Sequence, residues 1–463
     1  MEAFTLFIEK LSGFVWNSVL IFLLLGTGIF YTIKLNFVQI RKFKEGYLRV
    51  VKGATLNGKA AGEDGMSSFQ SLATAIAAQV GTGNLAGAAT AIAAGGPGAI
   101  FWMWLSAFFG MATVYSEAVL GQLFKRKVEG QMTGGPAYYI SEGLGNTKFS
   151  KALAAFFGIM CILALAFMGN AVQSNSIAIA FHNVIPSVST GVFGAIIAIL
   201  AGFIFLGGVK RIASFTEKVV PVMAGTYVLA TIIIILFNLS EIVPALKMIV
   251  VGAFNPSAIF GGALGVTIKQ AIRFGVARGV FSNEAGMGST PHAHAVAKVK
   301  HPCEQGAVAI LTVFIDTFIV LTCTAVVIIM KGDLANTKLT GIELTQAAFV
   351  GAMGRHGAIF IAICLLFFAF STIVGWYYFG ETNIKYLFGI KALTPYRLIV
   401  VACIFLGSLA KVDLVWVLSD FFNGLMAFPN LVALLILYKY VKKSSDEYEI
   451  ISAVERENLK KEV

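Results

Sequence analysis

The segment Gly81-Thr82-Gly83-Asn84 places two glycines and two polar side chains inside an apolar run. Glycine accepts backbone angles that open a helix, and such a break survives at membrane depth only where it is buried or lines a watered cavity. Free N–H groups near Thr82 to Leu85 suit a carboxylate, and free carbonyls near Ala77 to Val80 suit a bare sodium ion. These residues therefore predict a site for a zwitterionic amino acid beside a cation.

Close packing between helices is the alternative role for these glycines, and the spacing of Gly83 and Gly87 supports it in part. A second glycine-rich span, Gly261 to Gly288, argues for a binding site. It carries the polar run Phe281 to Gly286 and charged side chains that are costly at membrane depth and usually functional. Those charged residues are Lys269, Arg273, Arg278 and Glu284.

A later span carries adjacent hydroxyls at Ser371 and Thr372, with Trp376 one helical turn beyond Thr372. The hydroxyls could complete a sodium shell, and the indole could wall a small side-chain pocket. Alternatively, the hydroxyls bond their own helix and the tryptophan only packs. The amides of Asn170 and Gln173, with Ser174, share one helix side and either contact substrate or tie helices together.

His292, His294, His301 and Cys303 gather in a predicted cytoplasmic loop. Their irregular spacing leaves a metal site conceivable but favours a solvated loop. The five cysteines stand singly in or beside apolar segments, which indicates small buried hydrophobes and no disulfide framework.

These residues need a membrane scaffold to position them. The chain has 463 residues, of which 57% are hydrophobic and 13% charged, and its mean hydropathy is +0.82. A water-soluble domain could not carry that balance, so we expect an all-α polytopic membrane protein. The apolar runs predict eleven transmembrane helices, near residues 14–33, 67–93, 98–124, 151–180, 188–208, 217–238, 258–288, 306–330, 345–380, 394–410 and 413–440.

The net charge of +11 does not indicate nucleic-acid binding, because lysines and arginines cluster in alternate short loops, such as residues 34–59 and 125–127. The positive-inside rule places those loops in the cytoplasm. With an odd number of spans, the N-terminus lies outside and the C-terminus is cytoplasmic. The first apolar run follows Glu2 and Glu9 and has no cleavage site, which indicates a retained span.

Setting residues 14–33 aside as an extra N-terminal helix leaves ten spans in two sets of five, 67–238 and 258–440, followed by a cytoplasmic tail, 441–463. Because five is odd, the two sets enter the membrane from opposite sides. Paired interrupted helices at matching positions of such repeats point to a transporter's binding site. We therefore expect one transmembrane domain, 1–463, with discontinuous first and sixth repeat helices.

Four motifs and the segment Ser371 to Trp376 resemble the alanine or glycine:cation symporter family over nearly the whole chain. The resemblance implies a LeuT-type fold and sodium-coupled symport of alanine or glycine into the cell across the cell membrane. No cofactor is implied beyond sodium as co-transported ligand, and we expect a working monomer. The motifs are residues 81–87, Gly95 to Trp104, Met132 to Pro136 and Arg278 to Gly286.

The resemblance also implies residue roles. Thr82, Gly83, Asn84 and Gln173 resemble the substrate contacts, and Trp376 resembles the residue that limits side-chain size. Around 271–275 we expect contacts from the second broken helix. Gln79 stands where the family pattern favours a smaller polar residue. The contacts around 271–275 are Ile272, Phe274 and Gly275, and the sodium positions are the carbonyls of Ala77, Val80 and Phe368 with the hydroxyls of Ser371 and Thr372.

Two alternatives remain open. A carrier of this fold could use protons, or carry another small solute such as a nucleobase derivative, and the membrane-located carboxyls Glu117, Glu284, Asp316 and Glu381 could relay protons. An intramembrane enzyme built on His292 and His294 would need catalytic groups that converge at one depth, whereas these histidines precede the basic residues Lys298 and Lys300.

Overall fold

The computed structural model describes residues 2–53, 65–256, 267–334 and 339–461, and helices make up most of them. The strands in this part of the chain are β1 (Arg126–Val128) and β2 (Gln131–Thr133), an antiparallel hairpin. Seven helices in the described part are long and apolar enough to cross a membrane, or eight if the bent pair Ile21–Lys34 and Val38–Val51 is one span. The prediction of an all-α polytopic membrane protein is confirmed, while the number of eleven spans stays a prediction.

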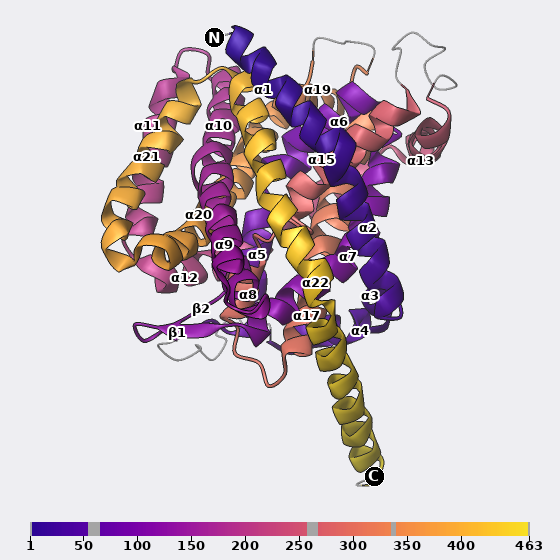
Figure 1. Cartoon of the computed structure of the whole chain (residues 1–463). Helices are drawn as coiled ribbons and strands as arrows, with labels where there is room; N and C mark the ends of the chain where they lie inside the picture. The colour runs from indigo at the N-terminus through magenta and orange to yellow at the C-terminus, as the bar shows by residue number, and fades with distance from the viewer. Residues whose placement is uncertain (1, 54–64, 257–266, 335–338, 462–463) are drawn as a thin grey trace.

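The N-terminal part forms one helical run that bends after Lys34. Its elements are α1 (Glu2–Val15), η1 (Trp16–Leu20), α2 (Ile21–Lys34), α3 (Val38–Arg41) and α4 (Phe43–Gly53). The two chain ends lie at opposite ends of the molecule, with α22 (Val412–Lys461) projecting from the body (Figure 1). The predicted tail at 441–463 is thus helical through Lys461.

The predicted span 67–93 is interrupted at the expected place. Helix α5 (Ser68–Gln79) starts with a capping box between Ser67 and Gln70, and Val80 then takes an extended conformation. The chain resumes as the π-helix η2 (Gly83–Gly87) and α6 (Ala88–Gly95). The break needs glycine at position 81, because a Cβ there would lie 2.3 Å from Thr372 Oγ1.

The second interruption lies further along the chain than its glycines suggest. Gly275 and Gly279 are inside the continuous helix α15 (Ile268–Asn283), while Gly261, Gly262 and Gly265 lie outside the described residues. The helix ends at Glu284, which has a left-handed φ of 57°. Gly286 and Gly288 follow with φ of +83° and +78° before the short helix α16 (Pro291–Ala295).

Two long helices contain π-helical turns, which often mark functional positions. The run α9 (Lys148–Cys161), η3 (Ile162–Gly169) and α10 (Asn170–Val184) brings the amide-rich stretch inward. The run α17 (Pro302–Val313), η4 (Phe314–Leu321) and α18 (Thr322–Lys331) carries Asp316 in its π-helical part.

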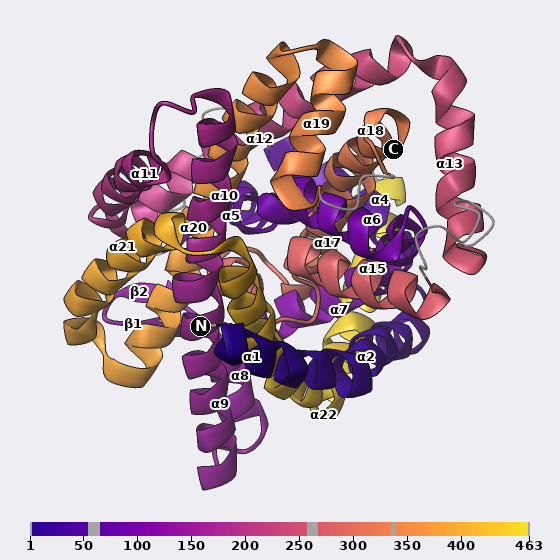
Figure 2. The same ribbon diagram turned by 90° about the horizontal axis from the view of Figure 1, so that it is seen from above.

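Seen from above, α5, α6, α15 and α17 lie inside a ring of other helices (Figure 2). Apolar side chains fill the spaces between them, and the tryptophan Trp376 is among the largest fully buried residues. The remaining elements are α7 (Ala99–Leu123), α8 (Pro136–Gly143), α11 (Thr190–Phe205), α12 (Gly208–Leu236), α13 (Leu239–Phe254), α19 (Gly341–Met353), α20 (His356–Phe388), η5 (Ile390–Ala392) and α21 (Leu393–Leu409).

The prediction of a single span over 345–380 is wrong. Gly354 takes a φ of 63° and ends α19, and α20 begins two residues later at His356. The sequence does mark this turn, with Gly351, Gly354 and Gly357 around Arg355, but the apolar residues on both sides suggested one continuous span. The predicted outer connection Glu241 to Pro256 is largely helical as α13.

Candidate functional site

The end of α5 and the middle of α20 bring five predicted sodium positions together. Thr372 Oγ1 lies 2.9 Å from the carbonyl oxygen of Ala77, 3.4 Å from that of Val80 and 3.1 Å from that of Phe368. Ser371 Oγ lies 3.3 Å from the carbonyl of Ala77 and 2.8 Å from that of Phe368. All five residues are fully buried. The cluster offers neutral oxygens, the hard donors that sodium prefers.

The helix break explains why a main-chain oxygen of α5 is free to face α20. In a continuous helix, the carbonyl of Ala77 would accept from the N–H of Gly81. Here the N–H of Gly81 instead donates to Asn84 Oδ1 at 3.0 Å. The next amide, that of Thr82, donates to Gln173 Oε1 on α10 at 3.1 Å. At the break, helical hydrogen bonds are therefore replaced by bonds to side chains, one from Asn84 of the same segment and one from Gln173 of α10.

The residues predicted to hold the substrate backbone lie against this cluster. A Cβ on Gly81 would meet both Thr372 Oγ1 and, at 3.1 Å, Gln173 Oε1, so Gly81 separates the sodium cluster from the amide of Gln173. The hydroxyl of Thr82 is buried and has no hydrogen-bond partner among the described residues. A buried polar atom of this kind usually has a partner, and a bound ligand can supply one.

The second broken helix reaches the first one at Ser282 and Asn283. A Cβ on Gly83 would lie 2.8 Å from Ser282 Cα, and Gln79 Nε2 donates to the carbonyl of Asn283 at 2.6 Å. Gln79 thus links the two breaks, and this hydrogen bond explains why a long side chain fits at position 79.

Three predicted contacts on α15 are not brought to this junction. Gly275 packs on α7, where a Cβ would lie 2.4 Å from the carbonyl oxygen of Ala99. Ile272 and Phe274 are half-buried. Ser282 is seven residues beyond Gly275, about 10 Å along a helix.

A carboxylate that the predicted site omitted joins the two breaks. Asp316 is fully buried and accepts from Asn84 Nδ2 at 2.6 Å and from Ser282 Oγ at 3.0 Å. Thr317 Oγ1 adds a third donor at 2.8 Å. The sequence carried a signal for Asp316, since a carboxyl group inside an apolar span is costly unless it is used.

The indole of Trp376 lies on α20 near the second break. Its ring meets the ring of Phe281 edge-on, with centroids 5.9 Å apart, and its Nε1 donates to Glu284. Asn170 Nδ2 lies 3.5 Å from the carbonyl of Ile373 on the same helix. The two candidate polar stretches of α10 and α20 therefore face each other.

The interpretation of His292 and His294 as part of a solvated loop is wrong. Both rings are buried, and His292 lies between the rings of Phe157 and Phe379. His292 Nδ1 faces the carbonyl of Ser289 at 2.6 Å, and Nε2 faces Asn383 Nδ2 at 2.9 Å. In the described part of the chain, no group of three His, Cys, Asp or Glu side chains could hold a metal ion.

Acid should destabilise the fold through these histidines. Burial lowers the pKa of His292 to about 4 and the pKa of His294 to about 3. In the unfolded chain each histidine has a pKa of about 6.5, so below that pH the unfolded state binds more protons than the folded state. The free energy of unfolding therefore decreases as the pH falls towards 4, by roughly 1.4 kcal/mol per pH unit for each histidine. Melting temperatures in detergent between about pH 8 and 4 measure this loss.

His292→Gln should make the acid loss shallower, because one titrating group is gone. His356→Gln removes an exposed ring and should leave the pH profile of the melting temperature unchanged. An H292Q profile as steep as that of the unsubstituted protein would contradict the role of His292.

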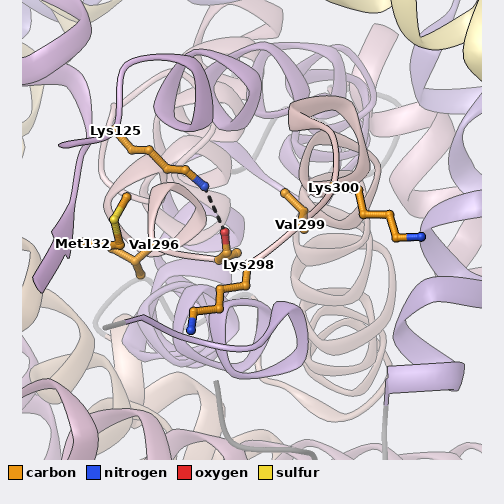
Figure 3. Close-up of a pocket in the computed structure, with 7 residues that line it drawn as sticks. Lys125, Met132, Val296, Lys298, Val299 and Lys300 are labelled. Carbon is orange, nitrogen blue, oxygen red and sulfur yellow. Dashed lines mark hydrogen bonds between the residues drawn. The ribbon is translucent and has the colours of Figure 1, made fainter. Parts of the chain in front are cut away.

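A surface pocket of about 470 Å³ lies beside the hairpin, apart from this site (Figure 3). Lys125 Nζ donates to the carbonyl of Ala297 across it at 3.4 Å, while the amine of Lys300 points away from the other labelled side chains. None of the predicted sodium or substrate residues lines it. Its lining is Lys125, Met132, Val296, Ala297, Lys298, Val299 and Lys300.

The whole chain matches a known protein family. The model of the sodium:alanine symporter family covers residues 1–462. The chain belongs to the sodium:alanine symporter family. It is 42% identical over 459 residues to the sodium/alanine symporter AgcS of Methanococcus maripaludis, covering 98% of this chain and 99% of that protein.

Other relatives have names with other cations or substrates. The chain is 41% identical over 461 residues to a putative sodium/proton-dependent alanine carrier, YrbD, of Bacillus subtilis, covering 96% of this chain and 92% of that one. It is also 41% identical over 435 residues to the probable sodium/glutamine symporter GlnT of Bacillus subtilis, covering 94% and 88%.

Membership of the sodium:alanine symporter family decides the class of function. The chain is a multi-pass membrane transporter that carries out cation-coupled amino-acid symport, with sodium as the co-transported ion. It is not an enzyme, and the hypothesis of an intramembrane enzyme at His292 and His294 is wrong.

Proposed function

We propose that this symporter carries alanine or glycine into the cell together with sodium, by alternating access. One observation carries the proposal: the oxygens of Ala77, Val80, Phe368, Ser371 and Thr372 converge where the first helix breaks, next to amides that leave their helix. Relatives named as alanine carriers support the choice of cargo. A cation at this cluster and a carboxylate beside it would attract each other in a region without water.

In this proposal, Thr82, Gly83, Asn84 and Gln173 hold the amino-acid backbone. The unpartnered Thr82 hydroxyl supports that role. Ser282, which lies against Gly83, takes the part that the sequence suggested for Ile272, Phe274 and Gly275 on α15. Trp376 limits the size of the side chain.

The proposed architecture is LeuT-type with eleven spans. An extra helix at 14–33 precedes inverted repeats at 67–238 and 258–440, and 441–463 forms a cytoplasmic tail. The chain works as a monomer in the cell membrane, with its N-terminus outside. The interruptions after Gln79 and Asn283 support the paired broken helices that such repeats contain.

In the proposed cycle, sodium joins α5 to α20 through the carbonyl of Ala77 and the hydroxyl of Thr372, which completes the amino-acid site. The hydroxyl of Thr372 already links the end of α5 to α20 through the carbonyls of Ala77 and Val80, and sodium would strengthen this link. A bundle that contains α5 then moves against the surrounding helices and opens the site to the cytoplasm. Coupling requires both solutes to occupy the same moving site.

Linkage between the two ligands tests the proposal at equilibrium. Purified protein should bind alanine at least about 10-fold more tightly in sodium than in potassium, and alanine should tighten sodium binding by the same factor. Radiolabelled alanine binding in the two salts measures this. Equal affinities in sodium and potassium would contradict a shared site.

Trp376→Phe should widen the range of substrates. The smaller ring leaves room for a longer side chain, and one methylene is worth about 10-fold or more in a closed pocket. We expect leucine to inhibit alanine uptake about 10-fold more strongly, with little change for glycine. Competition by glycine, both alanines, serine and leucine measures the effect.

Trp104→Phe is the control, because it also replaces an indole whose Nε1 donates to a neighbouring side chain, here Thr322 Oγ1 at 2.8 Å; Trp104 is half-buried, and Trp376 is fully buried. It should leave the order of competitors unchanged. A W376F protein that still rejects leucine like the unsubstituted protein would remove Trp376 from the pocket.

A further inference from the structure

The indole of Trp376 is held at two opposite edges. At one edge, Nε1 donates a hydrogen bond to Glu284 Oε1. At the other edge, the ring rests on Gly169, where a Cβ would lie 2.5 Å from Cζ3 and 2.6 Å from Cε3. Rotation of the ring away from Glu284 would therefore break a hydrogen bond. A residue larger than glycine at position 169 would displace the ring.

Glu284 is itself fixed at the point where α15 ends. Its φ of 57° turns the chain out of the helix, its N–H still donates to the carbonyl of Val280 at 2.8 Å, and its side chain is fully buried. The second carboxylate oxygen, Oε2, accepts from Ser289 Oγ at 2.5 Å. Both carboxylate oxygens thus have partners, one on α20 and one in the link that follows α15.

Gly169 is fixed by its own helix. It is the last residue of the π-helix η3, next to the polar stretch of α10 that begins at Asn170. A Cβ there would also lie 2.8 Å from the carbonyl of Ala164, so the position is closed on the helix side as well. The notch that receives the indole belongs to a third element, separate from α15 and α20.

We propose that Glu284 and Gly169 are specificity-determining positioning residues, which set the size limit for the transported side chain by fixing the Trp376 indole. The inference rests on the proposed role of Trp376 as the pocket wall. A wall excludes a longer side chain only if it cannot yield, and a side chain is held to within a fraction of an ångström by packing and by hydrogen bonds behind it. Glu284 supplies the bond and Gly169 the packing surface.

Two substitutions of Glu284 separate its hydrogen bond from its charge. In E284Q, the amide oxygen can accept from Trp376 Nε1, and the amide N–H can donate to Ser289 Oγ. In E284L, neither bond forms and Trp376 Nε1 is left buried without an acceptor, which favours another indole position. We expect E284Q to keep the ratio of the alanine inhibition constant to the leucine inhibition constant, and E284L to raise that ratio about 10-fold, because leucine then inhibits more strongly.

Gly169→Ala tests the other edge without touching the hydrogen bond. The new methyl group must displace the indole, because 2.5 Å is far below a normal carbon contact. The alanine-to-leucine ratio should change in G169A, while G158A, a tight glycine earlier in the same helical run whose Cβ would lie 3.2 Å from Leu387 Cδ1, should keep it. If E284L does not fold, G169A alone decides, and an unchanged ratio overturns the proposal.

A double-mutant cycle distinguishes this inference from the role of Trp376 itself. If Glu284 acts through the indole, E284L should change the ratio in the unsubstituted protein and add nothing in the W376F background. If W376F changes the alanine-to-leucine ratio but E284L and G169A do not, the inference about Glu284 and Gly169 is overturned, and the proposed role of Trp376 as the pocket wall stands. If W376F leaves the alanine-to-leucine ratio unchanged, both the proposed role of Trp376 and the inference about Glu284 and Gly169 are overturned.

Discussion

Gly81→Ala is expected to abolish sodium-dependent alanine uptake. The added methyl group would lie 2.3 Å from Thr372 Oγ1 and 3.1 Å from Gln173 Oε1, between the proposed sodium cluster and the proposed substrate amides. It must push α5 away from α20 or rotate the Thr372 hydroxyl out of the cluster. A clash of this kind costs about 3 kcal/mol, so we expect at least about a 100-fold loss of uptake.

Gly87→Ala is the matched control six residues later. Its Cβ would meet only the carbonyl of Thr82, at 3.7 Å, which is an ordinary contact. Uptake of labelled alanine by cells with equal amounts of each variant in the membrane compares the two. Near-normal uptake by G81A would show that α5 and α20 do not meet as described, and loss in both variants would indicate a general intolerance of this segment.

Thr372→Val should weaken sodium binding at least about 10-fold. Valine has the shape of threonine but lacks the oxygen that lies within 3.4 Å of three carbonyls, those of Ala77, Val80 and Phe368. An interaction with a charged partner is worth about 1.5–3 kcal/mol, which corresponds to about 10-fold to 100-fold. The sodium concentration for half-maximal uptake should rise, with smaller changes in alanine affinity at saturating sodium.

Thr382→Val provides the control on the same helix. Thr382 is buried, but its hydroxyl donates to the carbonyl of Tyr378 one turn back. T382V should keep the sodium dependence of the unsubstituted protein. If T372V and T382V show the same sodium dependence, the hydroxyl of Thr372 does not bind the ion.

The first break could be predicted from local residues because its glycines and its polar groups coincide. Gly81 and Gly83 flank Thr82, and the freed amides bond within a few residues, to Asn84, or to one facing helix, to Gln173. The oxygens proposed for sodium lie together because they belong to one helix end and one facing turn.

The second break could not be located from glycines alone. Gly275 looks like an opening in the sequence, but it lacks a side chain because Ala99 of α7 approaches there. The chain leaves the helix only at Glu284, whose left-handed φ is held by tertiary contacts such as those with Ser289 and Trp376. Membrane helices use glycine for both purposes, and only the neighbouring helix decides between them.

The burial of His292 and His294 could not be predicted from the sequence for a related reason. Lys298 and Lys300 made the segment around His292 look solvated, yet Phe157 and Phe379, which are distant in sequence, cover the ring. Asp316 shows the reverse case. Its carboxyl was visible in an apolar run, but its partners Asn84 and Ser282 come from two other helices.

The central claim, that a sodium gradient drives accumulation of a small amino acid, is tested by uptake of labelled alanine into proteoliposomes. With sodium outside and potassium inside, internal alanine should exceed the external concentration transiently, and collapse of the sodium gradient should abolish the excess. Accumulation that is equal without a sodium gradient, or that follows a proton gradient alone, would contradict the account.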